Sequence, residues 1–446
     1  MKNIKVYISI MLALLVLPSC DEYLDVKPAD TVIPETMEEF RALMTRAYYL
    51  VPAENSKLTM RTDEVKFYRW AWENDIASYK DIYLWEDETP APSTLSFGWQ
   101  SFYKAIFYAN HIIAEGSEIT DGTKEEVEQL QGEAYLMRAL MHFNLVNQYA
   151  SHYDLNSSAT DKGVPVSTVI DLEANYVPST VAEVYGLVES DLTKGLALLN
   201  VEEYELGKNY RFTKTSANAL QARVALYKNE WENALASAKT TLAIKSDLED
   251  LNNSESLIPS EYNSKESIMA LEEGIHAAVV NSVFVSDELM GVYDIDNDLR
   301  FAKYYSDNGS GSYVVSKGGD DKFRCTFRTA ELYLIAAEAS AQLDKLDDAR
   351  DYLNQLKVKR LKPDFYSTEV ARIAGMNRAE LIKEILTERF REFAFEGHRW
   401  FDLRRTTQPE IIHVFGDETV VLQQGDPRYT LPYPQEAINN NPNLAN

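Results

Sequence analysis

The stretches LQARVALYKNEWENALASAKTTL (residues 220–242) and LIAAEASAQLDKLDDARDYLNQL (residues 334–356) are two copies of one pattern. Each begins with an alanine-rich helical run, reaches a short polar turn, and continues into a second helical run that a bulky residue opens. The small, bulky and small positions fall at the same offsets: Ala222, Trp231 and Ala234 in the first copy, and Ala337, Leu346 and Ala349 in the second. Each copy is therefore expected to form two antiparallel helices that cross closely at the small residues.

This arrangement of small and bulky residues is the tetratricopeptide pattern, in which helix pairs stack side by side. One helix pair cannot bury its apolar stripe alone, so neighbouring pairs must cover it. We expect about three or four such pairs, over residues 99–245 and again over residues 326–405. The predicted fold class is all-α: a tetratricopeptide-like scaffold of helix pairs with a large irregular region on one face.

Two segments interrupt the helical pattern, residues 51–98 and residues 246–322. The first has aromatic residues at irregular spacing and the helix breakers Pro90 and Pro92, and the second is rich in Asn, Ser, Asp and Gly. Long segments of this kind between helices usually carry function. The tail after Arg405 has scattered prolines and is expected to lie against the helices as extended chain.

Capping boxes mark several helix starts. In such a box a threonine is followed three residues later by a glutamate, and each side chain satisfies a backbone N–H of the other residue. The three boxes lie at Thr36–Glu39, Thr123–Glu126 and Thr180–Glu183. Each precedes apolar residues at helical spacing, so helices are expected to begin at these positions.

The segment RAELIKEILTERFREFAFEGHRWFDLRR (residues 378–405) combines an apolar helical face with a dense run of charges. Glu388 and Glu392 lie one helical turn apart, and each has an arginine within reach along the helix. Gly397 is expected to end this helix. The charges fit a helix end that closes a core with arginine–carboxylate pairs around it, since buried arginine needs a partner. A ligand site is the alternative interpretation.

Residues 1–20 have the features of a bacterial lipoprotein signal peptide. A positively charged start and an apolar run too short to span a bilayer precede Leu17-Pro18-Ser19-Cys20, which matches a lipobox. Cys20 is therefore expected to become the lipidated N-terminus. The other cysteine, Cys325, is then left without a partner, and no disulfide is expected. Residues 21–446 are predicted to form a single domain.

The charge and the motifs argue against nucleic acid and against catalysis. The formal net charge is −26, whereas a nucleic-acid-binding protein needs a basic face. None of the six histidines stands in an HExxH or other metal-ligand spacing, and no GxSxG elbow or Gly-rich phosphate loop occurs. Asp294, Asp296 and Asp298 alternate as in a calcium loop, but the glycine is missing and Tyr305 replaces the bidentate glutamate. We expect no catalytic residue, no metal and no cofactor.

Aromatic side chains are dense over residues 67–85, where several lie among charged and amide residues rather than aliphatic ones. A flat ring packs well on the apolar face of a sugar, while neighbouring polar groups bond the sugar hydroxyls. Four rings of this segment and two rings of the second irregular segment are the candidate glycan-binding residues: Trp70, Trp72, Tyr83, Trp85, Tyr293 and Tyr304. The alternative is that these rings pack the loops onto the helices. We expect at least two rings of the first segment to be exposed.

Three further segments carry a family resemblance: GEAYLMRALMHFNLV (residues 132–146), FRTAELYLIAAE (residues 327–338) and ERFREFAFEGHRWFDLRR (residues 388–405). Together with the lipobox, they resemble the SusD/RagB family, surface lipoproteins of the Bacteroidetes that capture nutrients for an outer-membrane transporter. Asp21 and Glu22 resemble the signal that exports such lipoproteins to the cell surface. The resemblance implies a lipid anchor in the outer membrane, exposure at the cell surface, and a SusC-like TonB-dependent transporter as partner.

The resemblance also implies a ligand face built by the loops outside the repeats, so the two aromatic sets are expected to meet. The leading hypothesis is a non-catalytic protein that binds oligosaccharides and delivers them to the transporter. The second keeps the same architecture and binds peptides, as RagB-like members do. The third is a surface glycosidase that acts through a pair of carboxylates.

Overall fold

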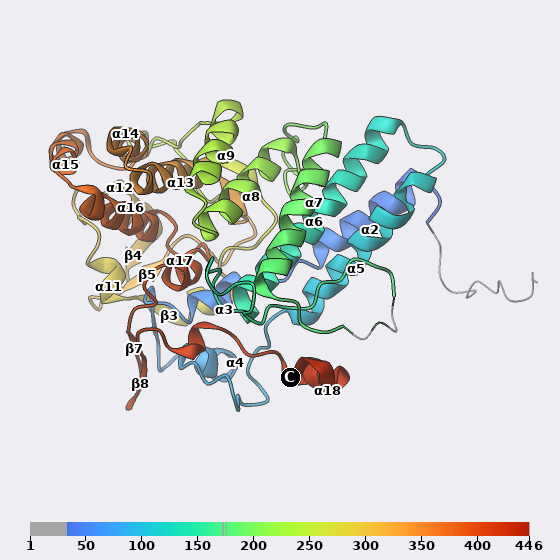
Figure 1. Ribbon diagram of the computed structural model, residues 1–446. Coiled ribbons are helices and arrows are strands. Elements are labelled where there is room, and N and C mark those ends of the chain that lie inside the picture. Colours follow the sequence, from blue (N-terminus) through green and yellow to red (C-terminus); the bar gives the residue numbers. More distant parts are fainter. Residues whose placement is uncertain (1–33, 172–173, 175, 446) are drawn as a thin grey trace, which may run out of the picture.

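The computed structural model describes residues 34–171, 174 and 176–445, and its long helices stack in a row (Figure 1). Along the row the order is α2 (Met37–Tyr49), α5 (Trp99–Glu115), α6 (Lys124–Tyr149), α7 (Val181–Leu198), α8 (Lys214–Tyr227), α9 (Trp231–Ile244), α13 (Thr329–Gln342) and α14 (Leu346–Lys357). At the far end lie α15 (Pro363–Ala374) and α16 (Arg378–Glu392), whereas α17 (Arg399–Arg405) lies nearer the middle of the molecule. The predicted scaffold of helix pairs is confirmed.

The segments between and after these helices hold short elements. The helices are α3 (Asn55–Thr59), α4 (Glu73–Tyr83), α10 (Ala277–Val280), α11 (Asp287–Met290), α12 (Leu299–Tyr304) and α18 (Gln435–Asn440), with 3-10 turns η2 (Gly116–Glu118), η3 (Pro427–Tyr429) and η4 (Pro442–Ala445). Two-stranded antiparallel sheets pair β1 (Val65–Phe67) with β3 (Val283–Val285), β2 (Ser267–Met269) with β6 (Phe327–Arg328), β4 (Tyr305–Asp307) with β5 (Tyr313–Val315), and β7 (Ile411–Phe415) with β8 (Glu418–Leu422). Since β1 and β3 come from different irregular segments, the two segments meet. The two aromatic sets meet only in part, where Tyr83 shares one buried cluster with Tyr293 and Tyr304.

The predicted capping boxes are all present. The hydroxyls of Thr36, Thr123 and Thr180 accept from the backbone N–H three residues on, and the glutamate there accepts from the threonine N–H. These bonds satisfy N–H groups that the first helical turn leaves open, so α2, α6 and α7 begin where the sequence indicates.

The repeated pattern is confirmed at both crossings and at both turns. Its four small residues are completely buried: Ala222, Ala234, Ala337 and Ala349. The turn residues Asn229 and Asp344 both have φ of 60°, the left-handed region that Asn and Asp tolerate better than most residues. The same turn therefore joins α8 to α9 and α13 to α14.

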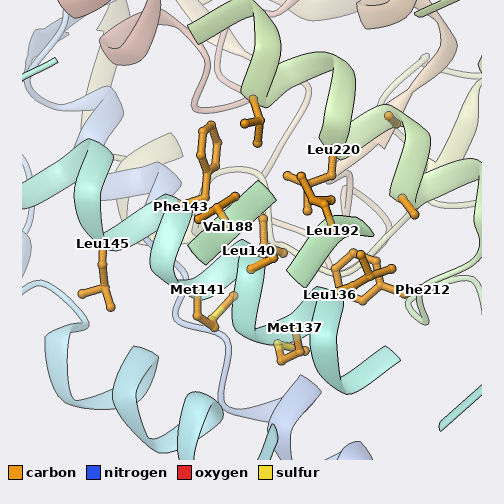
Figure 2. Close-up of a cluster of buried hydrophobic side chains, with 14 of the residues drawn as sticks. Leu136, Met137, Leu140, Met141, Phe143, Leu145, Val188, Leu192, Phe212 and Leu220 are labelled. Atoms are coloured by element: carbon orange, nitrogen blue, oxygen red, sulfur yellow. The ribbon is translucent and has the colours of Figure 1, made fainter. Parts of the chain in front are cut away.

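The largest core surrounds α6 (Figure 2). Side chains of α6 such as Leu136 and Leu140 lie beside Val188 and Leu192 of α7, and Leu220 of α8 lies next to them. A side chain at Gly195 would place its Cβ only 2.8 Å from Leu136, so a glycine there allows α6 and α7 to pack closely.

Two sequence-based expectations about the C-terminal part are wrong. The tail is not extended throughout, because it forms the hairpin β7–β8 and the helix α18. Gly416, with φ of 63°, sits in the two-residue turn of that hairpin. In addition, α16 ends at Glu392 rather than at Gly397. The chain turns earlier because Phe395 takes a left-handed φ of 62° and its N–H donates to the carboxylate of Glu64, 2.9 Å away.

A buried ion cluster joins α16 to the rest of the molecule. The carboxylate of Glu392, with no exposed surface, accepts from Arg300 at 2.8 Å, from Arg328 at 2.7 Å and from Arg360 at 2.8 Å. Glu266 is shared between Arg328 and Arg360, at 3.0 Å and 2.6 Å. Burial alone would raise the pKa of Glu392, but the attraction of Arg360 and Arg328 outweighs it and holds that pKa well below the usual range.

This arrangement confirms the interpretation of residues 378–405 as a helix end with arginine–carboxylate pairs. The partners are more distant in sequence than expected, because Arg300 lies in α12, Arg328 precedes α13 and Arg360 follows α14. The cluster thus ties the second irregular segment to the last helix pairs.

Replacing Glu392 by Gln is predicted to destabilise the fold strongly, because three buried guanidinium groups lose the charge they share. We expect the free energy of unfolding, measured by urea denaturation, to fall by about 3–5 kcal/mol. The matched control is Glu418→Gln, which breaks the exposed 3.0 Å pair with Lys80 and should cost less than about 1 kcal/mol. Equal losses in the two variants would contradict a structural role for the cluster.

Candidate ligand-binding surface

Trp70 and Trp72 are the most exposed of the candidate rings, with 69% and 77% of their surface open to solvent. The neighbouring Tyr68 is 37% exposed. Large apolar side chains that gather on a surface usually mark an interaction site. The expectation that at least two rings of residues 67–85 are exposed is confirmed.

A rigid turn between β1 and α4 carries these rings. The N–H of Tyr68 donates to the carbonyl of Ser282 at 2.8 Å and so extends the β1–β3 pairing by one bond. The N–H of Ala71 donates to the carbonyl of Tyr68 at 2.9 Å, which closes the turn. Trp72 is the N-cap residue of α4, and its carbonyl accepts from Ile76 at 3.0 Å. The backbone that carries the rings is therefore fixed by hydrogen bonds before any ligand binds.

Polar groups lie beside the exposed rings. The guanidinium of Arg69 sits 4.6 Å from the Trp70 ring centroid, and the Ser282 hydroxyl donates to the Asp75 carboxylate at 3.0 Å. Tyr68 packs on Phe284, with 5.0 Å between ring centroids. An exposed guanidinium and a half-buried carboxylate thus flank the exposed rings in the chain.

Tyr83 and Trp85 are corrected from surface to core residues, because only 2% of each is exposed. Their rings stack on the two sides of His413 from β7, at 3.9 Å and 4.1 Å. The indole N–H of Trp85 donates to the Arg61 carbonyl at 3.1 Å. Helical spacing within α4 could have revealed Tyr83, because α4 buries Tyr79 and Tyr83 one turn apart.

Tyr293 and Tyr304 are also corrected to core residues, with 7% and 0% of their surface exposed. The Tyr293 hydroxyl donates to the carbonyl of Arg391 in α16 at 2.6 Å, and Lys317 lies 4.0 Å from the Tyr304 ring centroid. These rings pack the second irregular segment onto α16. No local pattern in the sequence distinguishes them from surface rings, because their partners lie far along the chain.

The aspartates of the calcium-like pattern have other partners. Asp298 binds Arg300 at 2.6 Å, and Asp294 accepts from the backbone N–H of Asn297 at 3.0 Å. Within the described ranges, no group of three His, Cys, Asp or Glu side chains is placed to hold a metal ion. Cys20, the predicted lipidation site, lies outside the described residues. Among the described helices, none is both long and apolar enough to cross a bilayer.

Neither of two cavities in the structure offers an aromatic surface of a size that suits a sugar. A cavity of about 30 Å³ lies between the helix scaffold and the corner before α17, lined by Asn147, Arg223 and His398 among others. It has room for about one water and is too small for a sugar ring. A wider groove of about 430 Å³ runs over α7, α8 and α9, but it has no aromatic lining residue.

The fold and this surface together define a class of protein: a stack of helix pairs that presents an aromatic, loop-borne surface outside the repeats. Two family models match the chain. One, described as starch-binding and associating with the outer membrane, covers residues 22–226, and the other, the SusD family, covers residues 296–446. The chain belongs to the SusD family.

Individual relatives agree with this assignment. The SusD-like protein P38 of Formosa agariphila is 27% identical over 91% of this chain and 92% of its own length. A SusD superfamily protein of Bacteroides thetaiotaomicron has a similar structure, with a TM-score of 0.76 at 21% identity over 92% of this chain and 98% of its own. A laminarin-binding SusD-like protein has a TM-score of 0.62 at 19% identity over 84% of this chain and 92% of its own. The family associates with the outer membrane.

Glu64, directly before β1, anchors the turn that carries the rings. Its carbonyl accepts from Ser286 at 3.0 Å, and its carboxylate accepts from Phe395 and from the Thr62 hydroxyl at 2.9 Å and 3.1 Å. No cation binds this carboxylate within the part of the chain that the structure describes. Burial raises the pKa of Glu64 to about 7, and the Phe395 N–H opposes only part of the shift.

Glu64 is predicted to make stability fall as the pH rises. Its folded pKa is above the ordinary value of 4.5, so the folded chain keeps a proton that the unfolded chain releases. The bound proton of Glu64 contributes roughly 3 kcal/mol to the free energy of unfolding. This contribution is complete below about pH 4.5 and is lost as the pH rises through 7. Glu64→Gln should remove this fall, measured as the difference in unfolding free energy between the two chains from about pH 4 to pH 8. A difference that stays constant with pH would contradict the assignment.

Proposed function

We propose that this protein is a non-catalytic, lipid-anchored lipoprotein of the cell surface that binds oligosaccharides and delivers them to a SusC-like TonB-dependent transporter. The observation that carries the glycan part is the pair of exposed indoles, Trp70 and Trp72, on a backbone turn fixed by hydrogen bonds. An indole face covers the C–H face of one sugar residue, and two faces suit an oligomer better than a single sugar.

The polar groups around the indoles fit the same ligand. The Arg69 guanidinium donates and the half-buried Asp75 carboxylate accepts, so the hydroxyl groups at the rim of a stacked sugar find partners of both kinds. The buried Ser282 hydroxyl holds that carboxylate from behind. Such a site is shallow and its affinity modest. Modest affinity is sufficient for a protein that must release its ligand into a transporter.

A sugar suits this surface better than a peptide does. An extended peptide gains affinity from backbone hydrogen bonds to a strand edge or from a deep groove. The exposed rings lie instead on a turn beyond the β1–β3 pairing, and the groove over α7–α9 lies on other elements. The laminarin-binding relative supports a glycan as ligand class by its name.

The anchoring and delivery parts of the proposal rest on the sequence and the family. Cys20 in its lipobox would hold the chain at the outer membrane, and the following Asp21 and Glu22 fit surface export. No catalytic step is proposed, because no motif in the sequence indicates one and the Asp75 carboxylate is already bonded by the Ser282 hydroxyl. A glycosidase needs a pair about 5–10 Å apart across the bond it cleaves. A reducing-sugar assay on the purified protein is expected to show only background.

Removing the exposed indoles is predicted to abolish glycan retention. Isothermal titration and affinity electrophoresis against a panel that includes laminarin and starch should show binding by the unchanged protein. Trp70→Ala and Trp72→Ala should each weaken the affinity about tenfold or more, because each ring face buries apolar area worth roughly 1.5–3 kcal/mol.

The matched control is Tyr49→Ala, which removes a ring on α2 that is 78% exposed and should leave glycan binding unchanged. Unaltered binding by both tryptophan variants would place the site elsewhere. Binding of peptides, with no binding of any glycan in the panel, would overturn the glycan part of the proposal.

A further inference from the structure

A second cluster of partly exposed rings lies on the linker between α7 and α8. Tyr204 and Tyr210 are half-buried there, and the Arg211 guanidinium carbon lies 5.8 Å and 5.5 Å from their ring centroids. Leu206 on the same linker is 65% exposed. This cluster shares no residue and no supporting element with the turn that carries Trp70 and Trp72.

The two tyrosines are held from behind. The Tyr204 hydroxyl donates to the buried carboxylate of Glu133 in α6 at 3.1 Å, and the Tyr210 ring packs edge-on against Tyr48 of α2 at 5.2 Å. The Nε of Arg211 donates to the Tyr210 hydroxyl at 3.3 Å. Two rings and one hydrogen bond therefore fix the guanidinium in place before any ligand arrives.

The linker itself is tied to the second irregular segment. The Asn209 side chain donates to the Tyr262 carbonyl at 2.8 Å, and the Asn209 carbonyl accepts from Ala270 at 2.9 Å. The Tyr262 side chain, 37% exposed, adds a third ring to this part of the surface. The cluster is thus a bonded junction of three parts of the chain rather than a free loop.

The terminal nitrogens of Arg211 have no protein acceptor in the described ranges, and no described carboxylate lies within ion-pair distance of this side chain. The nearest buried acid, Glu133, is already occupied, since Arg41 binds it at 2.7 Å and Tyr48 donates to it at 3.0 Å. Exposed Glu205 binds Lys208 at 2.8 Å. A preorganised guanidinium with free N–H groups is a receptor for a planar anion, above all a carboxylate.

We propose that Tyr204, Tyr210 and Arg211 form a second binding site, which takes a carboxylate-bearing sugar of the uronate class. The guanidinium binds the carboxylate through its free N–H groups, and the tyrosine rings cover the adjacent C–H face of the sugar. The choice of a sugar as the carrier of the anion rests on the proposed function. The net negative charge of the chain does not prevent this binding, because at physiological salt charges beyond about 8 Å are largely screened.

The test uses two ligands that differ only in charge, tetragalacturonate and its methyl ester, titrated calorimetrically into the full chain. The unchanged protein should bind the acid at least about tenfold more tightly than the ester, as expected for a hydrogen-bonded charge pair. Arg211→Gln should abolish that preference, and Arg211→Lys should restore part of it, because lysine keeps the charge without the planar fork. The control is Lys383→Gln, which removes one exposed positive charge on α16 and should leave the preference intact.

A double variant separates this site from the indole surface. With both Trp70 and Trp72 changed to Ala, ester binding should be lost while tetragalacturonate still binds, and adding Arg211→Gln should remove that remaining binding. Equal affinity for acid and ester, no binding of either, or a preference that survives Arg211→Gln overturns the second site and leaves the indole surface to its own test. Loss of all binding in the double tryptophan variant also overturns it, because one surface then accounts for every ligand.

Discussion

The shared carboxylate of Glu392 is the constraint on which the relative placement of the parts depends. It binds Arg300, Arg328 and Arg360, which come from an irregular segment, the entry to α13 and the exit of α14. Bringing such charges out of water costs several kcal/mol per ion, so the cluster is favourable only when every member finds its partner. A different placement of the irregular segment would leave buried charges unpaired, and the cluster therefore selects one placement out of many.

That constraint extends from α16 to the proposed ligand surface. The corner after Glu392 places Phe395 so that its N–H reaches Glu64, and Arg399, the first residue of α17, binds Asp63 at 2.6 Å. Asp63 and Glu64 directly precede β1, which leads into the turn with Trp70. The exposed indoles are thus connected to the ion cluster through a short series of buried polar contacts. The backbone of this turn is thus held in the free protein, and binding has only the ring side chains to order.

The sequence predicts the scaffold well, because its signals are local. A threonine three residues before a glutamate satisfies N–H groups in the same turn, and an alanine at a helix crossing is required by the partner helix within the same repeat. The identity of the ligand rings is less accessible to local reasoning. Trp72 and Trp85 have similar polar neighbours in sequence, yet Trp72 is exposed whereas Trp85 stacks on His413, more than three hundred residues away. The hairpin that supplies His413 does have a local signal, because Gly416 and Asp417 separate two apolar runs, but the prolines at either end of the tail favour extended chain instead.

The settings of the arginines distinguish the buried ion cluster from the two proposed ligand surfaces of this acidic chain. Most arginines bind a carboxylate or a carbonyl, as expected with 70 acidic and 44 basic residues. Three in the described ranges, Arg46, Arg69 and Arg211, instead lie against aromatic rings with no such partner. A ring attracts a guanidinium by about 0.5–1 kcal/mol at an exposed site without using its N–H groups. In the two proposed sites, ring area would supply affinity for any sugar, whereas the free donors would discriminate among sugars. Specificity within this fold can therefore change with one arginine while the scaffold and the rings remain as they are.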